Sequence, residues 1–296
     1  MSGNLGRKTQ KMGARIAFSR LGRLEAPALL LLMGLGLSRE AWPQSLIEAL
    51  TCSGLQLILP DNRDSGASEH FHNWRPTSGQ VIRGIARTLA RQPVDAGYSL
   101  EDMAADMVGL LDELKLSRVH VAGISLGGMI AQVLACRAPN RVLSLTSISS
   151  AVGNPKTGFG RLRAVGGILA QNRLSERQKL RFWAYLSGPR FPLSDADREL
   201  VLRNSKEKSD PAAVGRQLLA LLASGDRTEQ VRAIRVPTLV LHGEADPLLP
   251  LAAGVETAKL IPHAEFRSVP GLGHALPEAV TSRYAEWLVR HVASSS

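Results

Sequence analysis

Ser125 stands at the centre of a Gly-x-Ser-x-Gly motif, residues 123–127, directly after the mostly apolar run 118–122. A serine hydroxyl is a weak nucleophile, and a sharp turn between a strand and a helix lifts it clear of the backbone, beside a helix N-terminus. Glycine suits the flanking positions because a β-carbon would clash there. Small and apolar residues continue through 128–135, as expected of a helix packed tightly on a sheet. We therefore predict Ser125 as a catalytic nucleophile; a purely structural glycine turn is the alternative.

A serine nucleophile needs a base, and the base needs a carboxylate that orients it. Two later strand patterns supply candidates. The apolar run 236–242 is followed by Asp246, and the short run 265–269 leads into a glycine-rich loop that ends in His274. Residues that follow parallel strands gather at one edge of a sheet, so these side chains can reach Ser125. The chain order Ser, Asp, His is that of one of the known triad-bearing folds.

Several other polar residues have less specific interpretations. Glu244, two residues before Asp246, is the alternative orienting acid. His242 and His120 lie in apolar strand patterns and are interpreted as structural. His70 and His72 are interpreted as solvated loop residues, because no cysteine or acidic cluster completes a metal-like set of ligands. Charged groups near a core must pair. We therefore interpret four polar residues as a hydrogen-bonded turn behind the site: Asp61, Asn62, Arg63 and Asp64.

These motifs resemble those of the α/β-hydrolase superfamily, and the resemblance covers about residues 14–292. It is carried by residues 29–36, 60–68 and 98–105 together with the three catalytic segments. The pattern is most similar to the esterase branch that includes aclacinomycin methylesterase-like and cofactor-free haloperoxidase-like proteins. Many relatives have His-Gly after the third strand, where this chain has Met33 and Gly34; the branch often tolerates that change.

The resemblance favours Asp246 over Glu244 and implies a backbone oxyanion hole. Leu126, the residue after the nucleophile, would supply one N–H donor, and Leu35 would supply the other. The alternative for Leu35 is a plain turn at the end of a strand. No metal and no organic cofactor is implied.

The elements that must position these residues follow from alternating strand and helix patterns. We expect strands at 14–22, 26–33, 55–60, 118–122, 142–148, 236–242 and 265–269, and helices at 42–50, 81–91 and 100–116. The helix at 100–116 should begin after Ser99, a favourable N-cap. The fold class is therefore α/β: a mostly parallel twisted sheet flanked by helices, with a helical cap insertion.

Residues 151–235 interrupt the strand–helix alternation with helical patterns at 162–171, 176–186, 196–208 and 211–224. We interpret them as a helical cap over the catalytic edge, with residues 14–150 and 236–292 as the core and 1–13 as a basic flexible tail. Phe182, Trp183 and Leu186 follow one helical face and are candidate substrate-pocket residues; packing of the cap on the core is the alternative.

Composition limits the classes of function. The chain has 296 residues, 44% of them hydrophobic, which suits one large core with an insertion. No run of 18 or more apolar residues occurs, so no membrane span or membrane partner is predicted. Cys52 and Cys136 are expected to be free, mostly buried thiols, which suits the cytoplasm.

The net charge is +10, and residues 151–235 contain 16 Lys and Arg against 8 Asp and Glu, or +8. Aromatic residues make up only 4%, and no nucleic-acid motif interleaves with the basic residues, so no nucleic-acid partner is expected. A solvated basic surface is one interpretation, and a rim that attracts anionic substrates is the other.

The sequence thus predicts a serine hydrolase that acts on a small or medium carboxylic ester through an acyl-enzyme, as a monomer or homodimer. C–C bond hydrolase, lactonase or perhydrolase activity on the same fold is the alternative. A non-catalytic ligand-binding protein on the same scaffold is the alternative from another class.

Overall fold

A computed structural model describes residues 13–206 and 210–295. Within them, seven strands form one sheet in the order β1-β3-β2-β4-β5-β6-β7. β1 runs antiparallel to β3, and the other neighbouring strands are parallel. The strands are β1 (Phe18–Leu21), β2 (Ala28–Leu32), β3 (Gln56–Pro60), β4 (Val119–Ile124), β5 (Val142–Ile148), β6 (Thr238–Gly243) and β7 (Glu265–Val269).

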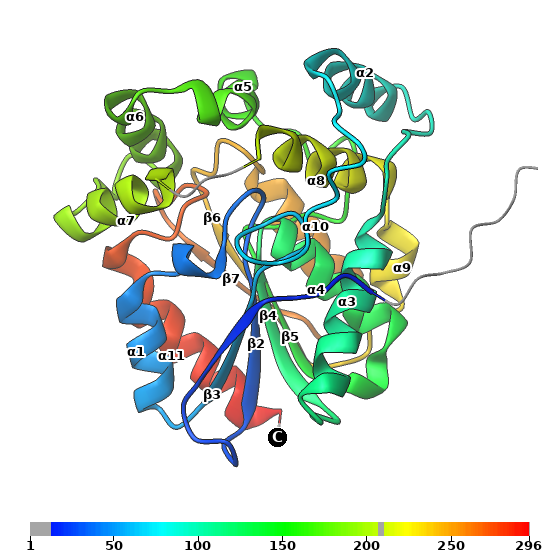
Figure 1. Ribbon diagram of the computed structural model, residues 1–296. Helices are drawn as coiled ribbons and strands as arrows, with labels where there is room; N and C mark the ends of the chain where they lie inside the picture. The colour runs from blue at the N-terminus through cyan, green and yellow to red at the C-terminus, as the bar shows by residue number, and fades with distance from the viewer. Residues whose placement is uncertain (1–12, 207–209, 296) are drawn as a thin grey trace, which may run out of the picture.

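Helices cover both faces of the sheet (Figure 1). They are α1 (Gln44–Cys52), α2 (Ser78–Leu89), α3 (Leu100–Glu113), α4 (Leu126–Arg137), α5 (Leu162–Ala170), α6 (Glu176–Ser187), α7 (Asp195–Lys206), α8 (Pro211–Ala223), α9 (Thr228–Arg232), α10 (Leu251–Leu260) and α11 (Glu278–Ser294). One apolar core lies between the sheet and α3, α4 and α10, and a second lies between the sheet and α1 and α11. The α/β-hydrolase architecture expected from the sequence is confirmed.

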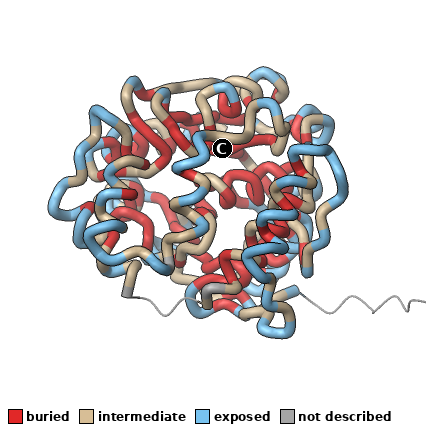
Figure 2. Tube along the Cα trace, turned by 90° about the horizontal axis from the view of Figure 1, so that it is seen from above, coloured by how far each residue is buried: buried red, intermediate tan, exposed pale blue. Residues whose placement is uncertain are grey.

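The central strands are buried on both faces, which explains their continuous apolar sequences. Every residue of β2 and β4 is buried. Seen from above, buried segments run through the interior and exposed segments lie mainly toward the outside (Figure 2). The only way for a polar side chain to reach solvent or a ligand from such strands is at their ends, and that is where the site is found.

Helices α5, α6, α7 and α8 lie together beyond one end of the sheet (Figure 1). They fall close to the four helical ranges expected for the cap. α9, which the sequence reasoning did not predict, is the last helix before β6. The boundaries of the cap at residues 151 and 235 stay a prediction. Of the predicted tail, residues 1–12 lie outside the described residues.

Several expected bounds were wrong by a few residues. β1 begins at Phe18 rather than at residue 14, because the backbone N–H groups of Ala14 and Ala17 donate to side chains of Asp106 and Ser68 instead of to a strand. The last helix, α11, for which the sequence analysis gave no bounds, ends at Ser294.

The cysteine thiols are both free, but the expectation that they are mostly buried was wrong. Cys52 ends α1 and is exposed, and Cys136 on α4 is partly exposed.

Candidate active site

Ser125 occupies the sharp turn between β4 and α4. Its backbone has φ 56° and ψ −119°, a conformation that residues other than glycine rarely adopt. Its N–H donates to the carbonyl of Ile148 at 2.9 Å. A β-carbon at Gly123 would lie 2.2 Å from the carbonyl oxygen of Gly127, and one at Gly127 would lie 2.1 Å from that of Leu32. The motif therefore needs both glycines for steric reasons.

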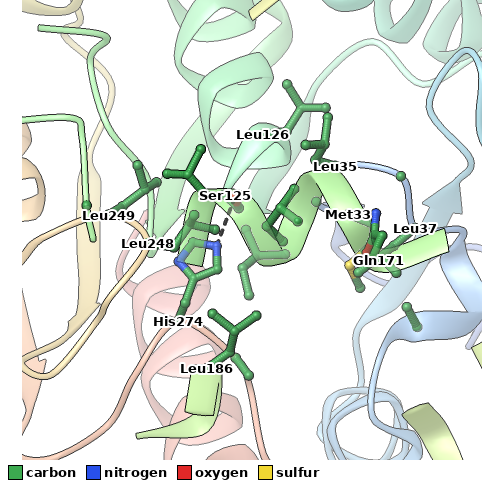
Figure 3. A pocket seen from close by; sticks show the side chains of 18 of the residues that line it. Met33, Leu35, Leu37, Ser125, Leu126, Gln171, Leu186, Leu248, Leu249 and His274 are labelled. Atoms are coloured by element: carbon green, nitrogen blue, oxygen red, sulfur yellow. Dashed lines mark hydrogen bonds between the residues drawn. The ribbon is translucent and has the colours of Figure 1, made fainter. Parts of the chain in front are cut away.

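His274 lies in the loop after β7, at the same end of the sheet. Its Nε2 is 3.0 Å from Ser125 Oγ (Figure 3). Its Nδ1 is 2.7 Å from Asp246 Oδ2. Its backbone N–H donates to the carbonyl of Leu186 at the end of α6, at 2.6 Å. The network fits the tautomer with hydrogen on Nδ1, in which Nε2 accepts the proton of the serine hydroxyl.

Asp246 follows β6 and is buried. Its Oδ1 accepts the backbone N–H groups of Leu248 and Leu249, both at 2.8 Å, which leaves Oδ2 for His274. Glu244 does not reach the histidine: it is exposed and accepts a hydrogen bond from Ser268 Oγ at 2.8 Å. The structure thus brings Ser125, His274 and Asp246 together and leaves the alternative acid aside.

His242 lies behind Asp246. Its Nε2 donates to the carbonyl of Leu249 at 2.9 Å and is 3.6 Å from Asp246 Oδ2. Burial lowers the pKa of His242 below its ordinary value, because the interior disfavours the charged ring. A neutral His242 fixes the segment whose amides hold Asp246, which agrees with the structural role expected for it.

The candidate oxyanion loop follows β2. Leu35 and Leu126 both line the cavity that contains Ser125 (Figure 3). Within residues 13–206 and 210–295, neither backbone N–H has a hydrogen-bond acceptor. The next amide, that of Gly36, is already engaged: it donates to Gln217 Oε1 on α8 at 2.8 Å. That difference supports Leu35, rather than its neighbour, as the donor.

Gln217 was missed by the sequence reasoning, as was Arg216 beside it. Gln217 also donates from Nε2 to the carbonyl of Arg63 and to Ser65 Oγ, at 2.7 and 2.8 Å. Arg216, with no exposed surface, pairs with Asp64 through two hydrogen bonds of 2.9 and 2.6 Å. A signal was available: these two polar residues interrupt an otherwise apolar helix.

Each side chain of the turn at residues 61–64 takes part in at least one hydrogen bond, as expected. Asp61 pairs with Arg39, and Arg63 pairs with Asp106 through two hydrogen bonds of 2.6 and 2.7 Å. Asn62 Nδ2 donates to the carbonyl of Met33 at 2.9 Å. Through the bond from Asn62 to Met33, the turn contacts the chain that leads into the candidate oxyanion loop.

The cavity above Ser125 has a volume of about 270 Å³ and mostly apolar walls. The three predicted pocket residues, Phe182, Trp183 and Leu186, all line it. The predicted nucleophile and base line it too, so the site and the cavity are one space. As expected for a structural residue, His120 is buried, and its Nδ1 lies 2.9 Å from Ser144 Oγ. His72 is exposed, as expected of a solvated loop residue, whereas His70 is only partly exposed and its Nε2 lies 3.1 Å from the carbonyl oxygen of Gly66. The rings of His70 and His72 stack.

Two features are absent from the described part of the chain. No group of three or more His, Cys, Asp or Glu side chains could hold a metal ion. No helix there is both long and apolar enough to cross a bilayer.

Comparisons with known proteins agree with this fold. The sequence model of a protein family described as alpha/beta hydrolase fold matches residues 27–278. Rhodomycin D methylesterase DnrP of Streptomyces peucetius is 28% identical over 300 residues, which cover 92% of each chain. The 2-hydroxy-6-oxo-2,4-heptadienoate hydrolase of Pseudomonas putida is 30% identical over 75% of this chain and 83% of its own.

Among solved structures, the meta-cleavage product hydrolase CumD of Pseudomonas fluorescens IP01 superposes with a TM-score of 0.74 at 20% identity. The match covers 96% of both chains. At that identity the likeness concerns the fold alone.

Proposed function

The chain belongs to the alpha/beta hydrolase fold family, and on that premise we propose that it is a serine hydrolase acting on a small or medium carboxylic ester. The hydrogen-bonded series Ser125, His274 and Asp246 carries the proposal. The methylesterase names of similar proteins support the choice of an ester.

In the acylation step, His274 Nε2 takes the proton of the Ser125 hydroxyl as its oxygen attacks the acyl carbon. Asp246 holds Nδ1–H in place and stabilises the imidazolium that forms. The tetrahedral intermediate then collapses, the C–O bond to the alcohol breaks, and His274 returns the proton to the leaving alcohol. The product of this step is an ester between the acyl group and Ser125.

In the second step, His274 takes a proton from a water molecule that attacks the acyl-serine. Collapse of the second intermediate releases the carboxylic acid and restores the serine hydroxyl, with the proton returned from His274. In both steps the amides of Leu35 and Leu126 donate to the negative oxygen. One such donor contributes roughly a hundredfold to a thousandfold in rate in well-studied enzymes.

The mostly apolar cavity favours an ester with an apolar acyl or alcohol group, and Phe182, Trp183 and Leu186 would contact it. We further propose a cytoplasmic enzyme, supported by the two free thiols, acting as a monomer or homodimer on a small-molecule substrate.

Hydrolysis of a C–C bond is the second candidate, because a relative of 30% identity is named for a dienoate substrate. Both reactions can use the same triad, so the substrate distinguishes them.

A p-nitrophenyl ester series of increasing acyl length, run beside a ring-cleavage dienone, tests the proposal. We expect turnover of the esters that depends on Ser125 and exceeds that of the dienone. Preferred turnover of the dienone would replace ester hydrolysis with C–C hydrolysis. Binding of both compounds without turnover of either would instead indicate a ligand-binding protein.

A further inference from the structure

One face of α6 forms a wall of the cavity. Lys179, Phe182, Trp183 and Leu186 are spaced by three and four residues, so they lie on the same side of the helix, and all four line the cavity. The wall therefore changes along its length from apolar side chains to an ammonium group.

The apolar end of this wall lies at the candidate triad. The carbonyl of Leu186 accepts the backbone N–H groups of His274 and Ala275, at 2.6 and 3.1 Å. Lys179 precedes Leu186 by two helical turns, a rise of roughly 10 Å. Because long side chains on a helix lean toward its N-terminus, the ammonium lies further still from His274.

Lys179 has no carboxylate partner among the side chains that the structure describes, although it is partly buried. Asp197 of α7 also lines the cavity, but its carboxylate is occupied. It accepts from the backbone N–H and the hydroxyl of Ser194 and from the N–H of Glu278. Among the described residues, Lys179 is thus the one unpaired positive charge that lines the cavity, and it lies toward the end away from Ser125.

Asn204, near the C-terminal end of α7, is a second polar residue that lines the cavity. α7 packs against α6. Asn204 lies two turns beyond Asp197, the residue that anchors α7 on the core. Asn204 lines the cavity, and its Oδ1 is buried without a hydrogen-bond partner in the described part of the molecule. Since the two ends of an asparagine amide can exchange, this group can also present N–H donors.

We propose that Lys179 and Asn204 bind a carboxylate of the substrate, about two helical turns from the scissile ester. The inference rests on the proposed function and specifies its substrate class: an ester whose apolar chain carries a second, terminal carboxylate. The chain would lie against Phe182 and Trp183. About eight to twelve carbons span the distance, because each C–C bond of about 1.5 Å advances the chain by slightly less. An ammonium and a carboxylate form a charge-assisted hydrogen bond, and an unpaired polar group in a partly dry pocket favours such a ligand.

The test compares pairs of esters of equal length, one ending in a carboxylate and the other in a methyl group. Two series place the terminal group on the acyl side (p-nitrophenyl esters) or on the alcohol side (acetates of ω-hydroxy acids). In at least one series we expect kcat/KM to favour the carboxylate about tenfold at eight to twelve carbons, equivalent to about 1.4 kcal/mol, and not at four.

Lys179→Met should abolish that preference, Lys179→Arg should retain it, and Lys179→Glu should reverse it. Asn204→Leu should weaken it. Arg177→Met is the matched control: it removes the same charge from an exposed position of the same helix, outside the cavity, and should leave the preference unchanged.

Calorimetric binding of the same ester pairs to Ser125→Ala separates this inference from the proposed function. If no ester is turned over, the proposed function fails while the binding preference still tests the subsite. Equal affinity for both members of every pair would overturn the subsite. So would equal losses for both members in Lys179→Met, or the same loss in Arg177→Met.

Discussion

At the scale of single residues, the site depends on a strained backbone at Ser125. A residue held in a sparsely populated conformation of this kind costs of order 1–3 kcal/mol. The surroundings fix it on both sides: its N–H donates to Ile148, and its carbonyl accepts from Met129 N–H and Ser150 Oγ. This backbone conformation places the Ser125 hydroxyl 3.0 Å from His274 Nε2.

Asp246→Asn is expected to lower kcat by roughly a thousandfold or more, because an amide favours the wrong tautomer of His274. Glu244→Gln should change kcat less than about threefold, since the exposed Glu244 carboxylate accepts a hydrogen bond from Ser268 and does not reach His274. Steady-state kinetics on one neutral p-nitrophenyl ester measures both variants. The opposite ranking would show that Glu244 is the orienting acid.

The residues of the proposed triad could be predicted because each follows a strand pattern that fixes where it must lie. Ser125 also has two glycines that only a crowded turn requires. Gln217 could not be predicted in the same way, because its partners, Gly36 and Ser65, are remote in sequence and contribute a backbone amide and a hydroxyl. No local pattern encodes such a contact.

At the scale of elements, α8 connects the cap helices to the candidate oxyanion loop. Arg216 of this helix forms an ion pair with Asp64. Gln217 accepts a hydrogen bond from the backbone N–H of Gly36 in the loop itself. The loop that would hold the oxyanion is therefore fixed partly from the cap side. Looseness of about 1 Å at such a loop can cost about a hundredfold in rate.

Gln217→Met should lower kcat by roughly tenfold to a hundredfold with little change in KM, because the loop loses the acceptor that holds Gly36. Gln132→Met is the matched control. Gln132 is also fully buried, and its amide donates to Ser147 Oγ rather than to the loop. We expect this control to lower the free energy of unfolding while retaining kcat. Equal kcat losses in the two variants, corrected for the folded fraction, would refute the role given to Gln217.

Sequence patterns located most elements, since buried strands and amphipathic helices have distinct periods. They failed where tertiary contacts override the pattern. α2 begins at Ser78, earlier than predicted, because Thr77 and Gln80 form a capping box that the apolar spacing does not record. α9 has five residues, too few for a period to be recognised.

At the scale of the whole molecule, three buried histidines make the free energy of unfolding depend on pH. Burial lowers the pKa of His120 to about 4, assisted by the nearby charges of His291 and Arg118. Burial also lowers the pKa of His242 and His291. His291 joins α11 to the sheet through the carbonyl of Leu145, at 3.2 Å.

The free energy of unfolding should therefore fall as the pH falls from about 6.5 toward 4. In that window the unfolded chain binds protons that the folded chain does not, so each histidine contributes a slope of at most about 1.4 kcal/mol per pH unit. Urea unfolding at several pH values should show a smaller slope for His120→Gln. His263→Gln, at an exposed position, should keep the slope of the unsubstituted protein. An unchanged slope in His120→Gln would mean that His120 does not contribute.

The central claim is that Ser125 is the nucleophile, and intact-mass analysis after treatment with a fluorophosphonate tests it most directly. One adduct per chain is expected, located by peptide mapping at Ser125, with loss of ester turnover in step with labelling. Ser125→Ala should fold with the same unfolding midpoint within a few degrees, take up no label and lose at least about a thousandfold in kcat. Labelling at another residue, or ester turnover retained by folded Ser125→Ala, would contradict the account.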